Sequence, residues 1–131
     1  MKEIVWQEQI IKGEKIRTRN GNMDEIIGLW SRVPEMNLSG HVYAIYYNYE
    51  SDHTGEFDFL IGTTEHESLE QVVLEEGQYL VMSILEATPE KVGQVWQSIW
   101  SNQDIYEKRL FTTDFEEYLP TGEVRIYLAI K

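Results

Sequence analysis

Hydrophobic and polar positions in the first half of the chain predict a strand, a helix and two further strands. Residues 3–18 alternate in the manner of an extended segment, and residues 22–34 repeat their apolar side chains at the helical period. Residues 41–49 and 56–62 are rich in aromatic and β-branched side chains, which indicates two strands joined by a turn. This half therefore predicts a β-α-β-β unit.

The second half repeats this order of elements. Trp96 in the second predicted helix lies 66 positions after Trp30 in the first, and Thr-Gly-Glu turns recur at Gly55 and Gly122, 67 positions apart. The elements predicted for this half are a strand at 78–86, a helix at 88–102 and strands at 109–118 and 123–131. The internal repeat indicates a pseudo-symmetric molecule, with its binding site at the junction of the copies.

The two units predict an α+β fold. We expect one domain over residues 1–131, with repeats at about 1–64 and 76–131. The duplicated units would form a curved antiparallel sheet with two helices around a central cleft. Residues 63–77, the most polar and acidic part of the chain, would connect the copies, with a short helix or strand inside them.

Particular residues mark the ends of the predicted elements. Asn22 followed by Glu25 has the spacing of a capping box, and Pro34 is expected to end the first helix. Thr88 before a proline is expected to cap the second helix. Gly13 inside the first extended segment indicates a bulge or bend.

Composition excludes several classes of function. The chain has 131 residues, no cysteine, and 23 acidic against 11 basic side chains, a net charge of −12. Disulfides, thiolate metal sites and cysteine catalysis are excluded, and the charge argues against binding nucleic acid. No apolar run approaches the length of a membrane span and no signal peptide is evident, so we expect a cytoplasmic protein without membrane association.

Catalytic and metal-binding motifs are not evident. The chain lacks a phosphate-binding glycine loop, a nucleophile elbow and a zinc-binding helix motif. Its histidines, His41, His53 and His66, lack the spacing of metal ligands, so we expect neither a metal nor a cofactor. The acid pairs at 75–76 and 116–117 cannot place both carboxylates on one strand face, which weakens a two-carboxylate hydrolase.

Glu116 is the strongest candidate for a functional residue. Strand alternation places Glu116 and Tyr118 on one face and Phe115 and Glu117 on the other. Aligning the repeats on their glycine turns puts Glu116 where the first half has Tyr49. A single carboxylate among aromatic rings is suited to a lipophilic cation, which gains cation–π attraction and a counter-ion. The alternative is that Glu116 is a solvated strand residue near a turn.

The aromatic side chains outnumber what a core of this size needs. Trp30 and Trp96 fall on the predicted helix faces, which favours a place in the core over contact with a ligand. The further candidates for the walls of a cleft are Trp100, Tyr43, Tyr46, Tyr47 and Tyr49. Of the aromatic residues we select Trp30, Tyr47, Tyr49, Trp96, Trp100 and Tyr118 as ligand-binding partners of Glu116.

The sequence resembles the GyrI-like effector-binding domain family over essentially its whole length. The resemblance rests on the doubled strand–helix–hairpin, GQYLVM, TPEKVGQVWQSIW and FTTDFEEYLPTGEVRIYLAIK, and YYNYESDHTGEFDFLIG looks closest to stand-alone and integron-cassette members. This family includes the sensing half of multidrug-responsive transcription activators of the MerR and AraC groups. It also occurs alone in gyrase-inhibitor-like proteins and cationic drug-binding proteins.

The resemblance implies a cleft for lipophilic cations with a buried glutamate as counter-ion. The family's Phe-Glu-x-Tyr signature falls on Phe115, Glu116 and Tyr118, so the acid carries over to Glu116, with Glu123 as a lower-ranked alternative. The chain shows no DNA-binding helix-turn-helix. It would therefore sense or buffer a compound alone or act on a partner, either a second copy of itself or a separate regulatory protein.

Three functions follow from these observations. The first is non-catalytic binding of a lipophilic, cationic small molecule by a regulator-like module. The second, implied by similarity to GyrI-like hydrolases, is hydrolysis of a lipophilic compound, with Glu116 as the base and Tyr118 or Tyr47 as hydrogen-bond donor. The third is a protein-interaction module of the gyrase-inhibitor type, which the acidic charge permits.

Overall fold

The computed structural model describes residues 2–131, which form eight strands and three helices. In chain order these elements are β1 (Lys2–Trp6), β2 (Gln9–Arg19), α1 (Met23–Met36), β3 (Val42–Tyr47), β4 (Glu56–Thr63), β5 (Glu70–Leu74), β6 (Gly77–Ile84), α2 (Pro89–Trp100), α3 (Gln103–Lys108), β7 (Arg109–Tyr118) and β8 (Val124–Ile130). The predicted α+β class is confirmed, with a third helix that the sequence pattern did not indicate.

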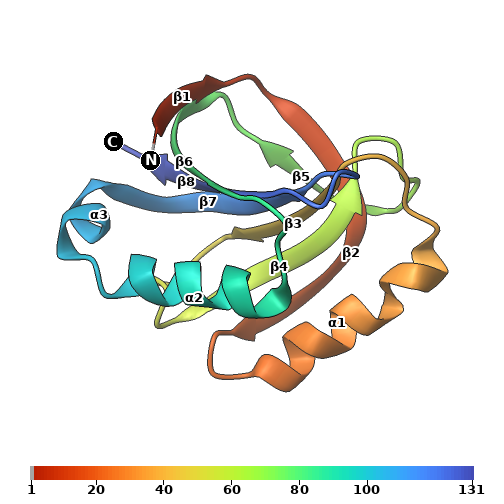
Figure 1. The fold of residues 1–131 in the computed structure, drawn as a ribbon. Coiled ribbons are helices and arrows are strands. Elements are labelled where there is room, and N and C mark those ends of the chain that lie inside the picture. Colours follow the sequence, from red (N-terminus) through yellow and green to blue (C-terminus); the bar gives the residue numbers. More distant parts are fainter. Residues whose placement is uncertain (1) are drawn as a thin grey trace.

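All eight strands belong to one curved antiparallel sheet, in the order β1-β6-β8-β7-β3-β4-β2-β5. The order is symmetric about the β7–β3 pair, since β8 and β4, β6 and β2, and β1 and β5 occupy matching places on either side. Both long helices lie on the same side of the sheet, α1 against the first half and α2 against the second (Figure 1). The predicted duplication is therefore visible in the topology.

The strand register corrects the expected alignment of the two halves. Phe59 on β4 and Ile126 on β8 are 67 residues apart, and their sheet partners are Tyr46 and Glu116 respectively. Glu116 is thus equivalent to Tyr46 and not to Tyr49. The reason is loop length: eight residues (48–55) join β3 to β4, whereas five (119–123) join β7 to β8. Because the loops differ by three residues, an alignment on the glycines pairs each residue of β7 with a position three residues too late in the first half.

The first helix differs from prediction at both of its ends. Asn22 precedes α1 without a side-chain capping bond, and Glu25 accepts a hydrogen bond from the Thr18 hydroxyl at 3.3 Å instead of closing a capping box. Pro34 lies inside the last turn and not beyond the helix. The helix ends at Asn37, whose left-handed φ of 55° breaks the repeat.

The second helix begins as predicted and is followed by a helix that was not predicted. Thr88 accepts a hydrogen bond from the Lys91 backbone N–H at 3.2 Å, and Pro89 occupies the first turn. After α2, Asn102 accepts from the Ile105 backbone N–H at 3.1 Å and begins α3. This helix of six residues is too short to leave a periodic signal in the sequence.

Gly13 marks a close approach of two strands and not the predicted bulge. Pairing between β2 and β4 runs without a register shift from Lys12 to Arg19, and Gly13 faces Gly62. A Cβ at Gly13 would overlap the Ile61 carbonyl, and one at Gly62 would overlap the carbonyl of Lys12. The predicted first segment is also divided into two strands, β1 and β2. The polar connection contains the edge strand β5, which pairs with β2.

Apolar side chains pack against both faces of the sheet. On the face turned toward the helices, α1 covers residues that include Phe57, Phe59 and Ile61 of β4, whereas α2 covers Ile126 and Leu128 of β8. The opposite face carries a separate cluster around Phe115 and Tyr127. No helix within residues 2–131 has the length and apolar character needed to cross a membrane.

Candidate functional site

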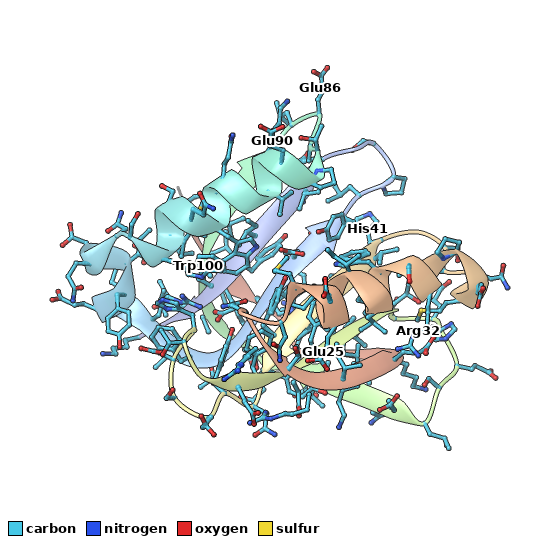
Figure 2. All side chains as sticks on the ribbon, turned by 90° about the horizontal axis from the view of Figure 1, so that it is seen from below. Glu25, Arg32, His41, Glu86, Glu90 and Trp100 are labelled. Atoms are coloured by element: carbon cyan, nitrogen blue, oxygen red, sulfur yellow. The ribbon has the colours of Figure 1, made fainter. Side chains whose placement is uncertain are left out.

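A cavity of about 690 Å³ lies between the two long helices and the sheet. One wall comes from α1, the opposite wall from α2, and strands β3, β4 and β7 supply residues between them. Figure 2, the view from below, shows both helices on the same side of the sheet, with side chains directed into the space that separates them. Because the walls belong to different halves of the chain, the cavity exists at the predicted junction of the two copies.

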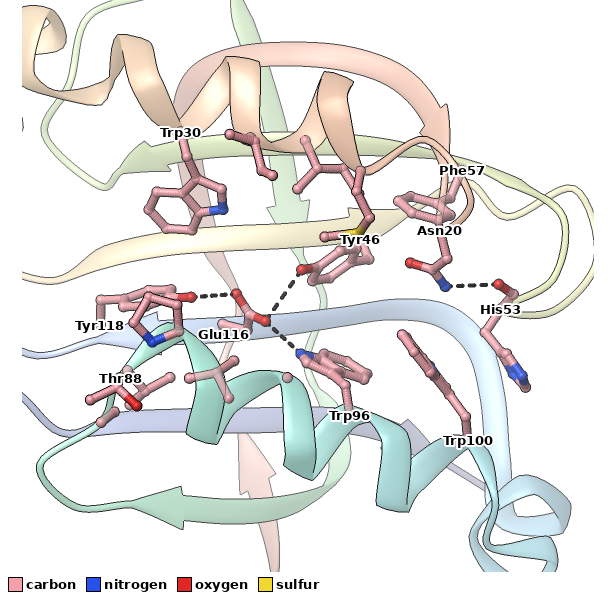
Figure 3. Close-up of a pocket in the computed structure, with 18 of the residues that line it drawn as sticks. Asn20, Trp30, Tyr46, His53, Phe57, Thr88, Trp96, Trp100, Glu116 and Tyr118 are labelled. Carbon is pink, nitrogen blue, oxygen red and sulfur yellow. Dashed lines mark hydrogen bonds between the residues drawn. The ribbon is translucent and has the colours of Figure 1, made fainter.

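Glu116 lies in this cavity and is held by three hydrogen bonds. Its side chain comes from β7 and the residue is only 2% exposed. Trp96 Nε1 donates to Oε2 at 2.5 Å, the Tyr46 hydroxyl donates to Oε2 at 3.2 Å, and the Tyr118 hydroxyl donates to Oε1 at 2.7 Å (Figure 3). All three donors line the cavity. The carboxylate is therefore fixed in one orientation by the aromatic walls themselves.

Burial and hydrogen bonding act in opposite directions on Glu116. Burial raises the pKa of its carboxyl above the ordinary value, because the charged form loses its hydration, while the bonds from Trp96, Tyr118 and Tyr46 lower it. Burial, assisted by the Glu116 charge, also raises the pKa of the Tyr46 and Tyr118 hydroxyls. Both phenols therefore remain protonated donors at neutral pH.

The cavity walls are aromatic on both sides. Trp30 on α1 meets Tyr118 edge to face, with ring centroids 4.9 Å apart. On the other side Trp96 packs against Tyr46 at 5.4 Å and stacks with Trp100 at 6.2 Å. Such rings offer apolar area and negatively polarised faces to a cationic ligand.

The structure brings together most of the residues selected from the sequence. Those that line the cavity are Glu116, Tyr118, Trp30, Tyr49, Trp96 and Trp100. The other one, Tyr47, lies on the opposite face of the sheet with the cluster around Phe115. Strand alternation explains the error, because Tyr46 and Tyr47 are adjacent in β3 and must face opposite ways. Asn48, with a left-handed φ of 54°, then interrupts the alternation and returns Tyr49 to the cavity side.

Several cavity residues were missed by sequence reasoning. Tyr46 was named only as one of several tyrosines that could line a cleft. Tyr46 and Tyr47 are adjacent in a strand, so their side chains point to opposite faces of the sheet and only one of the two could line it. His53, in the loop between β3 and β4, was considered only as a metal ligand and was not selected for the cleft. Arg109, at the start of β7, is 3% exposed and also borders the cavity. The sequence did contain a signal for Arg109, because it is a basic residue at the start of a predicted apolar strand.

The other acidic residues near the site differ from Glu116 in their partners. Glu117 points to the opposite face, where it accepts from the Tyr127 hydroxyl at 2.6 Å and from His41 Nδ1 at 2.8 Å. Glu123, the alternative counter-ion, borders the cavity but pairs with Arg125 at 2.6 Å. Within residues 2–131 no three His, Asp or Glu side chains are grouped so that they could hold a metal ion.

The fold is a symmetric antiparallel sheet with two helices on one face and an aromatic cavity between them. A family model described as "Cass2: Integron-associated effector binding protein" matches residues 5–130. The chain belongs to this family, in agreement with the resemblance to GyrI-like domains.

Individual relatives are consistent with this membership. The integron cassette protein from the mobile metagenome of Vibrio cholerae has a solved structure similar to this one, with a TM-score of 0.86 and 27% identity over 99% of this chain and 95% of that one. A putative transcriptional regulator of Bacillus subtilis (strain 168), YobU, is 30% identical over 81% of this chain and 79% of its own. A protein named SAV2435, solved bound to tetraphenylphosphonium, shares the fold at a TM-score of 0.77 and 18% identity, over 99% of this chain and 93% of its own.

Proposed function

We propose that this protein binds lipophilic cations in the cavity between α1 and α2, with Glu116 as the counter-ion, as a regulator-like module without turnover. The observation that carries the proposal is the lack of a basic partner at Glu116. Within residues 2–131, no Lys, Arg or His nitrogen comes within 4 Å of its carboxylate. A buried carboxylate that is ionised without a positive partner is unfavourable, and a bound cation would remove that cost.

The neighbouring acids on β7 support this interpretation. Asp114, which is fully buried, pairs with Arg109 at 2.6 Å, and Glu117 pairs with His41 at 2.8 Å and lies 3.8 Å from Arg125. Both therefore have their countercharge within the protein. Glu116 has neutral hydrogen-bond donors alone, which orient a carboxylate and leave its charge available to a ligand.

Cavity size and the bound neighbour agree with such a ligand. A volume of about 690 Å³ falls within the range of roughly 300–1,000 Å³ that small-molecule sites occupy. The protein named SAV2435, which shares the fold, was solved with tetraphenylphosphonium, a lipophilic cation. The net charge of −12 also favours the approach of cations.

Matched ions of opposite charge test this proposal. Tetraphenylphosphonium and tetraphenylborate have nearly the same shape, so titration of each by tryptophan fluorescence separates the role of charge from that of apolar contact. We expect saturable binding of the phosphonium, much weaker binding of the borate, and a loss of affinity for the phosphonium of at least about tenfold in Glu116→Gln. Equal binding of both ions, or an unaffected variant, would rule out Glu116 as the counter-ion.

The pairing of Glu116 with Tyr118 also supports a second candidate, hydrolysis of an electrophilic lipophilic compound. The Tyr118 hydroxyl lies 2.7 Å from Glu116 Oε1, so a carboxylate that activates water would stand beside a phenol that donates to the developing negative charge. Incubation with lipophilic esters and epoxides, followed by mass spectrometry, distinguishes the two functions. Product that forms with the wild type and not with Glu116→Gln would favour the enzyme.

A further inference from the structure

The cavity has a second polar end whose groups the binding of a cation does not use. In Figure 3, Glu116 lies between Trp30 and Tyr118 on one side and His53 and Trp100 on the other. The His53 end is completed by Arg109, which borders the same cavity.

The Arg109–Asp114 ion pair presents hydrogen-bonding capacity without net charge. Its guanidinium Nη2 donates to Asp114 Oδ2 at 2.6 Å, and the same oxygen accepts from the Tyr49 hydroxyl at 2.6 Å. The guanidinium also lies over the Phe111 ring, 4.2 Å from its centroid. Its Nε–H is buried and has no hydrogen-bond partner within residues 2–131. Since buried N–H groups are almost always bonded, this donor indicates a missing acceptor.

His53 adds a second unsatisfied polar group at the same end. Its ring stacks on Trp100 at 5.9 Å and lies 6.3 Å from the Phe111 ring, between the centroids. Its Nδ1 is buried without a partner in the described chain. Burial lowers the pKa of His53, assisted by the Arg109 charge and opposed by Asp52, so the imidazole is neutral at pH 7. A neutral imidazole has one N–H donor to offer.

The backbone of β7 is irregular at this end of the cavity. Phe111 has a φ of 55°, in the left-handed region that bulky residues rarely adopt, and the β7–β8 register shifts between Arg109 and Asp114. A shift of this kind redirects side chains, and strained residues of this type are concentrated at functional sites. Here the distortion brings the Phe111 ring under the guanidinium and beside His53.

We infer that the Arg109–His53 end of the cavity receives a neutral hydrogen-bond acceptor carried by the same ligand whose positive centre lies at Glu116. The ligand class is an amphipathic cation with a carbonyl, ether or ring nitrogen remote from its charge. A carboxylate is excluded as the acceptor, because Asp114 already neutralises Arg109 and His53 carries no charge. This inference rests on the proposed function and adds a second point of recognition to it.

Strand geometry guides the choice of probe. Asp114, which holds Arg109, and Glu116 are two residues apart on β7, so their Cα atoms lie roughly 7 Å apart. A three-carbon chain between the phosphonium and the acceptor has a comparable length. The probes are therefore (4-oxopentyl)triphenylphosphonium and (4-methylidenepentyl)triphenylphosphonium, which differ only in a carbonyl oxygen against a CH₂ group.

Isothermal titration of both probes tests the inference. A purely apolar cavity would prefer the alkene, because the ketone must give up its hydration. We expect the wild type to bind the ketone at least as tightly as the alkene. His53→Phe, which keeps a ring against Trp100, and Arg109→Lys, which keeps a charge beside Asp114, should each reduce the ketone-to-alkene affinity ratio about tenfold, the value of one hydrogen bond. His66→Phe, a loop histidine outside the cavity, should leave the ratio unchanged.

The outcomes separate this inference from the proposed function. If both probes bind with a ratio that neither variant changes, the acceptor site is refuted and the cation site stands. If neither probe binds, both proposals fail. His53 is partly exposed, so its variant keeps the test valid even if Arg109→Lys does not fold.

Discussion

Trp96 Nε1 lies 2.5 Å from Glu116 Oε2, so the indole that forms one wall of the cavity also holds the carboxylate. Trp96 comes from α2 and Glu116 from the central strand β7, twenty residues apart in the chain. The position of α2 over the sheet is therefore coupled to the orientation and ionisation of the acid. A hydrogen bond to a charged group contributes about 1.5–3 kcal/mol, more than an ordinary neutral pair.

Trp96→Phe tests this coupling. The substitution keeps an aromatic wall and removes the N–H donor, so the pKa of Glu116 should rise further and affinity for tetraphenylphosphonium at pH 7 should fall roughly tenfold. Affinity measured against pH should increase as Glu116 ionises, with its midpoint displaced upward in the variant. Trp100→Phe is the control, since Trp100 lines the same cavity and donates no hydrogen bond to Glu116. An identical pH profile for wild type and Trp96→Phe would contradict the coupling.

Glu116→Gln should stabilise the ligand-free protein relative to wild type as pH rises. Burial raises the folded-state pKa of Glu116 above the ordinary 4.5, so both folded and unfolded states are protonated at low pH and no difference arises there. Above pH 4.5 the unfolded chain ionises first, and wild type loses stability until the pH passes the folded-state pKa. Urea unfolding at intervals between about pH 4 and 8 measures this difference. A wild type that gains stability over the variant across this range would show that the pKa is lowered.

Adjacent tyrosines in β3 should behave differently toward the ligand. Tyr46→Phe removes the donor 3.2 Å from Glu116 and should weaken phosphonium binding by roughly three- to tenfold. Tyr47→Phe, on the opposite face, should leave affinity unchanged within error. Both variants lose one hydroxyl from neighbouring residues, so unequal effects on affinity would show that the two side chains lie on opposite faces of the sheet. Equal losses would show that Tyr47 also reaches the ligand.

The contact between Gly13 and Gly62 should not tolerate a methyl group. Ala at either position would press a Cβ into a carbonyl of the facing strand, and we expect a loss of about 1–3 kcal/mol in the free energy of unfolding. Gly28→Ala in α1, where a Cβ meets open space, should instead stabilise the protein by about 0.5–1 kcal/mol. Chemical denaturation of the three variants checks this order. A neutral Gly62→Ala would mean that β2 and β4 can separate slightly at low cost.

The sequence was sufficient to predict the class of fold and the location of the cavity. Alternation around Phe115 separated Glu116 and Tyr118 from Glu117, because a regular strand has a fixed period of two. The recurrence of Trp30 as Trp96 indicated that equivalent helices come from two copies. These features depend on local periodicity, which a sequence displays directly.

The errors occurred where the backbone departs from a regular period. Asn48 in a left-handed conformation reverses the face of the residues that follow it, so Tyr49 lies in the cavity although regular alternation would place it on the face of Tyr47. The shift before Asp114 brings Arg109 into contact with that acid in the same manner. His53 reaches the cavity from the loop between β3 and β4, and α3 begins at the cap residue Asn102. None of these features leaves a periodic signal.

The equivalence of Tyr46 and Glu116 has a consequence for how a site of this charge can arise. Two identical half-chains related by a twofold axis would place the same residue on both sides of the β3–β7 pair. Such a dimer would hold two carboxylates, which repel one another, or two phenols and no charge. A fused chain can differ between its halves, so a phenol on one side donates to a carboxylate on the other. Duplication within one polypeptide thus permits a monovalent site at the centre of a twofold scaffold.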